Sequence, residues 1–418
     1  MQAQFGRDEV ATLDAPAPVF DPRENGFFDD PYIQYNRLRD LDPVHRTAAG
    51  LVMCFAHDDV RRVLVDSATS MDSRKVAELG TSGSHTAARR LFPHGVINLD
   101  APDHTRLRQL MSKSFTPRKI AVLGTWIQAE VDCLLDDVER RWTETGEPVD
   151  LIGDFAFPLP FKVISDILGM PDGDQRQVRD WAQDVSAATD PTAGRARVAG
   201  AHAAYAAISE YVANEVLPWK RGHLADDLLS ALVIARDDGK LSEPELLDQV
   251  TLLYVAGHET TVGLIGNSIL TLLRHRTQMD KLIGEPDLMA GAVEELNRYE
   301  SAIQFGWRYT LNELTVRDET VGPGQMVLLC IGSANRDAGY FGPTAGELDL
   351  TRSNAAAALS FGAGIHFCLG SALARREATL ALGSLLERFP RMELAGPPVW
   401  NRRITFRSLD SLTVALSS

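Results

Sequence analysis

The stretch FGAGIHFCLG, residues 361–370, says more about this chain than any other ten residues. Its three glycines allow the backbone to bend tightly and to approach a flat partner closely. Cys368 ends this turn and directly precedes a predicted helix with a leucine stripe. A cysteine at a helix N-terminus meets the positive end of the helix dipole, which lowers the pKa of its thiol. The stretch therefore predicts a thiolate that binds a metal.

The alternative for Cys368 is an ordinary buried free cysteine, which is common in protein interiors. We accept this alternative for Cys54, Cys133 and Cys330 and expect all three to be buried. No two cysteines form a C-x-x-C pair, so a zinc or thioredoxin-type site is not expected. Four thiols in 418 residues also do not make a disulfide scaffold, so a reducing cytoplasm is the expected compartment.

Charge and hydropathy exclude several classes of function. The formal net charge of −15 disfavours nonspecific binding to nucleic acid or to anionic membranes. The first sixteen residues contain no apolar run, so we expect neither a signal peptide nor a membrane anchor. The most apolar stretch, 250–273, is interrupted by His258, Glu259 and Asn267, and it predicts a buried helix rather than a membrane span.

Predicted helices precede a small β portion along the chain. Ser242 and Glu245 have capping-box spacing at the start of the longest helix, which runs to Arg274 and is apolar on nearly every side. About 33 residues at ~1.5 Å each make this helix roughly 50 Å long. The order indicates a mostly α fold with a small β portion (α+β), in one domain spanning 1–418 with an irregular arm at 1–25. Other expected elements are helices at 30–46, 118–145, 153–169, 174–190, 196–219, 225–236 and 287–300, a strand and short helix at 51–66, a loop at 67–97, strands at 303–331 and a hairpin at 403–416.

Two pairs of polar residues have helical spacing. Glu295 and Arg298 are three residues apart, and such a pair alone is usually a solvated contact worth under about 1 kcal/mol. His104 and Arg108 are four residues apart in DAPDHTRLRQL, residues 100–110, and alone they indicate an ordinary basic helix. Neither pair would identify a site without the cysteine loop.

The long helix carries AGHETT, residues 256–261. Ala256 and Gly257 make the helix thin, so that a ligand can lie against it. Thr260 can donate to a main-chain carbonyl and bend the helix locally. Glu259 is an acid in an apolar stretch. Without a functional role, it would be a buried polar residue whose carboxylate accepts hydrogen bonds from neighbouring groups.

The cysteine loop resembles the ligand signature F-x-x-G-x-H-x-C-x-G of the cytochrome P450 family. AGHETT, the Glu-x-x-Arg pair and the helix at 100–110 stand in the order of that family, as does the triplet 335–337, so the resemblance covers nearly the whole chain. It implies the P450 fold, a triangular prism of helices with a long central helix over haem b (iron protoporphyrin IX). The five fixed positions of the signature are filled by Phe361, Gly364, His366, Cys368 and Gly370.

The resemblance also implies roles for individual residues. Cys368 is the metal ligand, and Glu259 with Thr260 is the catalytic pair that delivers protons during oxygen activation. Glu295 and Arg298 form a structural pair that fixes their helix to a nearby meander. The implied cofactor-binding set is Cys368, His104, Arg108, Arg308, His366, Phe361, Gly370, Ala256 and Gly257, with the two arginines and two histidines at the haem propionates and Phe361 on the lower haem face.

These roles imply a monooxygenase that uses O₂ and two electrons to hydroxylate or epoxidise an apolar small molecule. The sequence contains no flavin or iron–sulfur signature, so the electrons are expected from an external ferredoxin and its reductase. Six basic residues could form a patch on the cysteine side that binds an acidic ferredoxin. Alternatively, these residues are ordinary solvated surface groups. This patch consists of Arg106, Lys113, Arg118, Lys119, Arg375 and Arg376.

The substrate pocket is expected beneath a roof made by the 67–97 loop and a helix pair within 172–224. Its apolar walls are expected to include Leu252, Val255, Ala256 and Ile303. The Ala- and Arg-rich composition suggests a high-GC bacterium, in which such enzymes modify natural products such as polyketides and macrolides. We expect a cytoplasmic monomer.

Two other functions stay open on the sequence alone. A haem-thiolate oxidase could catalyse coupling, desaturation or peroxide-driven oxidation, although the pair Glu259 and Thr260 favours O₂ activation. A non-catalytic haem-binding sensor or carrier would need neither a proton relay nor a roofed pocket.

Overall fold

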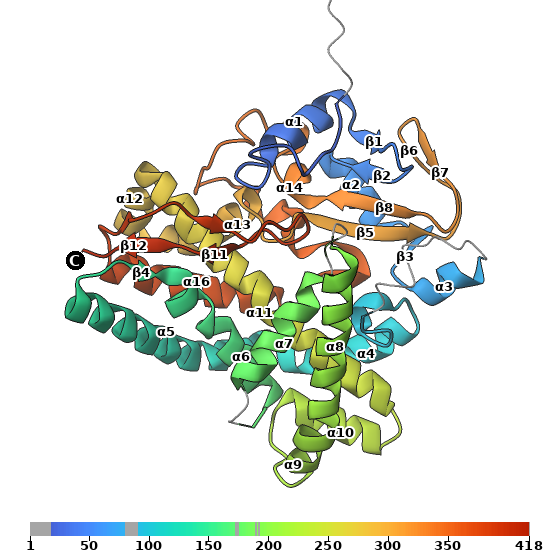
Figure 1. The fold of residues 1–418 in the computed structure, drawn as a ribbon, viewed down its shortest axis with the longest axis horizontal. Coiled ribbons are helices and arrows are strands. Elements are labelled where there is room, and N and C mark those ends of the chain that lie inside the picture. Colours follow the sequence, from blue (N-terminus) through green and yellow to red (C-terminus); the bar gives the residue numbers. More distant parts are fainter. Residues whose placement is uncertain (1–17, 80–90, 172–174, 189, 191–192, 418) are drawn as a thin grey trace, which may run out of the picture.

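The computed structural model describes residues 18–79, 91–171, 175–188, 190 and 193–417. Helices make up most of it, and the largest β-sheet lies at one side, toward the upper right of Figure 1. The prediction of a mostly α fold with a small β portion is confirmed. That the chain is one domain stays a prediction.

The central helix α11, Glu243–Arg274, is confirmed almost to the residue. Both hydrogen bonds of the predicted capping box form, since Ser242 Oγ accepts from Glu245 N and the Glu245 carboxylate accepts from Ser242 N. Most of its residues are buried, as the apolar surface on all sides predicted. It passes through the middle of the molecule (Figure 1) and contacts several other helices. These are α6 Pro158–Leu168, α7 Gln175–Ala187, α8 Arg195–Tyr211, α10 Leu228–Asp237, α12 Arg276–Gly284, α13 Met289–Tyr299 and α16 Ser371–Arg388.

Helices α7 and α8 run side by side across α11 (Figure 1), so the predicted roof pair is present where the structure describes it. Residues 172–174, 189, 191 and 192 lie outside the described residues. A π-helical segment, Val212–Val216, connects α8 to α9 Leu217–Arg221. The long helix α5, Pro117–Thr145, packs along α16 on the opposite side.

The β region consists of four small sheets. The largest has the strand order β1-β2-β8-β5-β3, with β2 and β8 parallel and the other pairs antiparallel. Its strands are β1 Val44–Arg46, β2 Val52–Cys54, β3 Thr69–Ser70, β5 Phe305–Thr310 and β8 Met326–Cys330. The others are β6 Leu314–Val316 with β7 Glu319–Val321, β10 Val399–Trp400 with β11 Leu409–Ser411, and β4 Val149–Asp150, β12 Thr413–Ala415 and β9 Glu393–Leu394.

Three sequence predictions of local structure were wrong. The C-terminal stretch 403–416 is not a hairpin, because β11 pairs with β10 whereas β12 lies between β4 and β9. The region 67–97 is not all loop: it contains β3 and helix α3, Ser73–Glu78, while 80–90 lies outside the described residues. Only 32–41 of the segment 30–46 is helical, as α1 Tyr32–Leu41, and its end forms β1.

The remaining predicted helices agree with the structure within a few residues. The segment 51–66 forms β2 and then helix α2, His57–Val65, as expected, and residues 18–25 of the N-terminal arm are irregular. Residues 1–17 of this arm lie outside the described part. Among the described residues, no helix combines the length and the hydropathy that crossing a bilayer requires.

Three further α-helices lie in the described part of the chain: α4 Asp103–Ser112, α14 Ile331–Ala334 and α15 Ala338–Phe341.

Candidate active site

The cysteine loop is a closed turn that presents Cys368. Its hydrogen bond from Cys368 N to Phe361 O, 2.9 Å long, joins the two ends of the loop. Gly362 and Gly364 have φ angles of +71° and +72°, which residues with side chains rarely adopt. A Cβ atom on Gly364 would also lie 3.3 Å from Val65 Cγ1, so this glycine allows a close approach of the loop to α2.

The pKa of the Cys368 thiol is raised, whereas the sequence predicted that it is lowered. The helix α16 begins at Ser371, three residues after the cysteine. Burial raises the pKa of the Cys368 thiol, and the opposing effects of the Gly370 N–H group and the charges of Arg108 and Arg375 are smaller. Desolvation of a thiolate is costly, and a bound metal cation would supply the missing compensation.

Ala256 is exposed although most residues of its helix are buried, so an open space borders this turn of α11. Thr260 Oγ donates to Ala256 O at 2.9 Å, which confirms the predicted back-bond. The predicted wall residues Leu252 and Val255 are buried in the main core near this turn. Ile303 is half-buried and forms an isolated β-bridge with Phe406.

Gly257 allows a close contact between two helices. A Cβ atom at this position would lie 2.9 Å from Ile164 Cδ1. The glycine therefore allows α11 to pack closely on α6. That Gly257 also lies against the haem stays a prediction.

Four basic side chains gather beside the cysteine loop. The rings of His104 on α4 and His366 in the loop meet edge to face, with centroids 4.6 Å apart. The charges of Arg308 on β5 and Arg108 on α4 both lower the pKa of His366, after burial, and bring it to about 3. Arg108 Nη2 also donates to Phe367 O at 2.6 Å.

No carboxylate of the described residues pairs directly with the cluster, since Asp100, whose charge acts on His104, Arg308 and His366, bonds Ser70 and Lys75 instead. Arg308 is buried, and its pKa is lowered to about 10 by burial. Its donors reach Met71 Sδ, Leu64 O and Trp307 O, and it forms no ion pair within the described ranges. The Nε2 atoms of His104 and His366 are buried and have no partner among the described residues. Buried cations and donors without partners are costly, so the cluster fits a ligand that carries carboxylates.

This arrangement fits haem b. Cys368 would provide a sulfur ligand for the iron, while the cluster of His104, Arg108, Arg308 and His366 would provide donors for two propionates. Phe361 lies next to the cysteine, with Arg375 stacked 4.3 Å from its ring centre. Gly370 directs its N–H at the sulfur.

We expect Arg308→Met to loosen the haem. A hydrogen bond to a charged group contributes about 1.5–3 kcal/mol, so loss of this partner should speed haem release roughly 10- to 100-fold. Transfer of haem to apomyoglobin measures the rate without any turnover. Arg46→Met is the matched control, because Arg46 forms a half-exposed ion pair with Glu319 in the same β region. Equal release rates in both variants would contradict a propionate role for Arg308.

The catalytic acid proposed from the sequence has a partner that the sequence did not reveal. Glu259 Oε1 accepts a hydrogen bond from Arg403 Nη1, and the two side chains form an ion pair. Arg403 stands 144 residues further along the chain. Neither local spacing nor periodicity could have predicted this contact.

A second set of polar contacts was also missed. Asp248 on α11 accepts hydrogen bonds from Tyr205 on α8 and from the backbone N–H of His94. Gln249 Oε1 accepts from Val96 N, and its Nε2 donates to His94 O. These contacts attach residues 91–98 and the roof helix α8 to the central helix. Asp248 and Gln249 are adjacent polar residues on a largely apolar helix, and this pattern could have predicted that they bond neighbouring segments.

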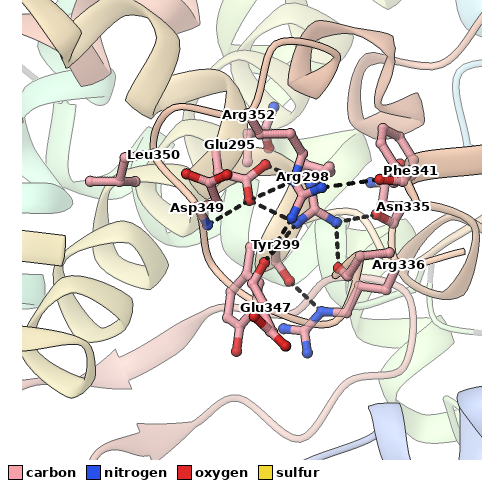
Figure 2. A network of polar contacts seen from close by, with 12 residues as sticks. Glu295, Arg298, Tyr299, Asn335, Arg336, Phe341, Glu347, Asp349, Leu350 and Arg352 are labelled. Atoms are coloured by element: carbon pink, nitrogen blue, oxygen red, sulfur yellow. Dashed lines mark hydrogen bonds and ion pairs between the residues drawn. The ribbon is translucent and has the colours of Figure 1, made fainter. Parts of the chain in front are cut away.

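The pair Glu295–Arg298 is buried, which corrects the reading of an isolated Glu-x-x-Arg as a solvated contact. Arg298 Nε and Nη2 donate to the two carboxylate oxygens of Glu295 at 2.6 and 2.8 Å. Figure 2 shows that Arg298 also reaches into the segment after β8, where it donates to Asn335 O at 2.6 Å and Ala345 O at 2.8 Å. Arg352 Nε donates to Glu295 Oε1 at 3.1 Å, a third member that the sequence analysis did not name. The pair thus fixes α13 to the meander, as the resemblance implied.

Cys133 was expected to be buried but is exposed, whereas Cys54 and Cys330 are buried as expected. Burial raises the pKa of Cys54 to about 12 and that of Cys330 further. Both therefore stay protonated thiols at neutral pH. Cys368 differs from all three, because it is half-buried in a loop surrounded by basic groups.

Comparisons with known proteins agree with this site. A family model described as Cytochrome P450 matches residues 210–398. The chain is 39% identical to Cytochrome P450 107B1 of Saccharopolyspora erythraea, over 94% of this chain and 96% of that protein. It is 36% identical to the polyketide biosynthesis cytochrome P450 PksS of Bacillus subtilis, over 96% and 99% of the two chains. The crystal structure of CYP109E1 from Bacillus megaterium in complex with testosterone is similar, with a TM-score of 0.84, 30% identity and coverage of 94% and 99%.

The matches extend over nearly the full length of the chain, and each relative is covered almost completely. The residues that the family model matches include the loop that presents Cys368 and, of the cluster, Arg308 and His366. The chain therefore belongs to the cytochrome P450 family and is a bacterial-type monooxygenase with haem b as its cofactor.

Proposed function

We propose that the protein hydroxylates or epoxidises an apolar small molecule, using O₂ and two electrons from an external ferredoxin and its reductase. The observation that carries the proposal is the basic cluster beside Cys368, whose members form no ion pair among the described residues and include two histidine Nε2 atoms without a partner there. Haem bound there supplies the oxygen activation, for which the cysteine thiolate donates electron density.

The chain's own residues then have three tasks. Cys368 holds the iron, and the cluster of His104, Arg108, Arg308 and His366 fixes the orientation of the cofactor. Glu259 and Thr260 move protons toward the reacting oxygen from the α11 side. The Thr260 hydroxyl is held by its bond to Ala256 O, next to the open space, where it can accept and donate in turn.

We propose that Leu252, Val255, Ala256 and Ile303 contribute to the walls of the substrate pocket. The name of PksS places that relative in polyketide biosynthesis, and the CYP109E1 structure contains testosterone. Polyketides and steroids such as testosterone are large, mainly apolar molecules. We therefore propose a bacterial natural product such as a polyketide or macrolide as the substrate class. A panel that includes testosterone, screened by the haem absorption shift that follows loss of bound water, tests this class directly.

The predicted ferredoxin-binding patch is smaller than expected. Arg106 pairs with Glu245, Lys119 with Asp226 and Arg375 with Glu294, so half of the six cations are balanced by acids. Arg376 lies over Gly124 on α5, where a Cβ atom would be 2.8 Å from its guanidinium. Lys113 and Arg118 are exposed, and we propose that these two carry most of the attraction for an acidic ferredoxin.

We expect Thr260→Ala to uncouple electron use from product formation. A positioned proton donor contributes about 10²- to 10⁴-fold, so product per NADPH should fall by roughly 10²-fold while NADPH consumption continues. The measurement compares NADPH consumed, product and hydrogen peroxide. Ser268→Ala is the matched control, because Ser268 makes the same type of back-bond, to Leu264 O, further along α11. Normal product yield in Thr260→Ala would refute the proton route.

A further inference from the structure

The C-terminal segment between β10 and β11 carries Arg403, which bonds both the central helix and the roof. Arg403 Nη1 donates to Glu259 Oε1 on α11 and, at 3.0 Å, to Ser186 Oγ on α7. The next residue is also attached, because Ile404 N donates to Asp190 Oδ2 at 2.9 Å. This turn of the chain therefore connects α11 with the end of α7.

Only one of the two carboxylate oxygens of Glu259 has a hydrogen-bond partner among the described residues. The side chains of Arg403 and Glu259 are 16% and 11% exposed, so the ion pair is largely shielded from solvent. Glu259 Oε2 is buried and has no hydrogen-bond partner in the part of the chain that the structure describes. A buried carboxylate oxygen without a partner is costly, and an ordered water is its usual partner in such a place.

A polar cavity adjoins Arg403. Its volume is about 430 Å³, and six of its eight lining residues have polar or charged side chains. It is open to solvent and wide enough to hold several waters. Burial raises the pKa of Asp410 in its wall, and the charge of Arg403 opposes this rise, so the two groups interact. The polar lining comes from α7, α8 and the C-terminal segment: Gln183, Asp184, Arg197, Asn401, Arg403 and Asp410.

We propose that this cavity is the water inlet of Glu259 and that Arg403 is the positioning residue between them. The proposal rests on the proposed proton route through Glu259 and Thr260. Arg403 does not carry protons itself, because a guanidinium does not lose its proton in proteins. It holds Oε1 so that Oε2 is left to accept a hydrogen bond from a water that enters from the cavity.

The stoichiometry of the reaction predicts which product should increase when Arg403 is removed. Each turnover uses one O₂, two electrons from the ferredoxin and two protons. One oxygen atom enters a C–H bond of the substrate, and the other leaves as water with the two protons. When protons are misdirected, the same O₂, electrons and protons leave as hydrogen peroxide instead. Loss of the positioning residue should therefore raise peroxide release without stopping electron uptake.

The first test uses the haem-containing enzyme with a plant ferredoxin, its reductase and testosterone as the probe. We expect Arg403→Met to raise the peroxide formed per NADPH severalfold and Arg403→Lys to recover part of the coupling. Arg402→Met is the matched control, since the exposed Arg402 is the neighbouring residue and stacks on Phe28 instead of pairing with Glu259. Equal peroxide yields in Arg403→Met and Arg402→Met would overturn the proposal.

A peroxide-driven reaction separates positioning from structural damage. Hydrogen peroxide brings both the oxygen and the protons, so oxidation driven by it should be unchanged in Arg403→Met. If Arg403→Met lowers the peroxide-driven and the NADPH-driven reactions equally, Arg403 has only a structural role and the proposal is wrong.

A second readout does not depend on turnover. High-resolution crystal structures of the haem-bound wild type should show an ordered water on Glu259 Oε2 that leads to the cavity, and Arg403→Met should lose it or displace the carboxylate. Absence of this water in the wild type would refute the inlet. If the proposed proton route itself is wrong, Thr260→Ala should keep the wild-type yield of product per NADPH consumed. An uncoupled Thr260→Ala beside a coupled Arg403→Met would refute only the role of Arg403.

Discussion

Cys368→Ser should abolish the oxygenase activity and shift the absorption of the reduced, carbon-monoxide-bound protein to that of a haem without a thiolate ligand. Of all substitutions in the cysteine loop, we expect this one to have the largest effect. A serine hydroxyl is a poor donor to iron and supplies none of the electron density that favours O–O cleavage. The surrounding donors remain, because His104, Arg108, Arg308 and His366 are unchanged.

This prediction separates two functions of the site. The basic cluster should still retain haem in Cys368→Ser, so the protein should remain coloured but inactive. Cys133→Ser is the matched control, since Cys133 is an exposed free cysteine and should change neither the spectrum nor the turnover. An unaltered carbon-monoxide spectrum in Cys368→Ser would mean that the metal ligand has been assigned to the wrong residue.

The features that could be predicted from the sequence are those set by local rules. The capping box at Ser242 and the length of α11 follow from spacing and hydropathy over consecutive residues. The two positive φ angles in the cysteine loop follow from the glycines that alone adopt them readily. The Thr260 back-bond likewise needs only the preceding turn of its own helix.

The features that could not be predicted depend on contacts between distant segments. The strands β11 and β12 are adjacent in sequence, but each finds partners elsewhere, so a hairpin was the wrong reading. The Glu259–Arg403 pair joins positions 144 residues apart. Gly257 also shows this limit, because only the packing of α6 against α11 reveals what a side chain there would meet.

The pKa of Cys368 shows a different limit, because two opposing effects had to be weighed. The sequence reveals a nearby helix start and basic neighbours, both of which favour a thiolate. Burial depends on the whole fold, and here it raises the thiol pKa more than these groups lower it. The direction of a pKa shift at a buried thiol therefore cannot be read from the neighbouring sequence alone.

Removing either member of the Glu295–Arg298 pair should destabilise the fold strongly, because both residues lie in a structural contact between α13 and the meander. Both side chains are fully buried. Loss of Glu295 leaves Arg298 and Arg352 without their acid, and loss of Arg298 leaves Glu295 with Arg352 alone. Such changes cost about 3–5 kcal/mol, a large part of the roughly 5–15 kcal/mol that stabilises a typical domain. We expect Arg298→Met and Glu295→Leu to unfold at much lower urea concentrations than the wild type.

The geometry also predicts that a conservative change is not tolerated. Arg298 makes two parallel bonds to Glu295 and further bonds to the carbonyl oxygens of Asn335 and Ala345. A lysine ammonium has three donors at a single point and cannot form this planar fork. Arg298→Lys should therefore lose most of the stability that Arg298→Met loses, as measured by urea unfolding.

The neighbouring residue Glu294 provides the matched control. It pairs with Arg375, and both side chains are partly exposed, so Glu294→Gln should cost no more than about 1 kcal/mol. The double variant Glu295→Leu with Arg298→Met removes both charges of the pair and leaves only Arg352 without its acid, so it should be less damaged than the sum of the single variants. If Glu295→Leu and Glu294→Gln unfold at the same urea concentration, the buried pair does not hold α13 to the meander, and the haem site must be positioned by other contacts.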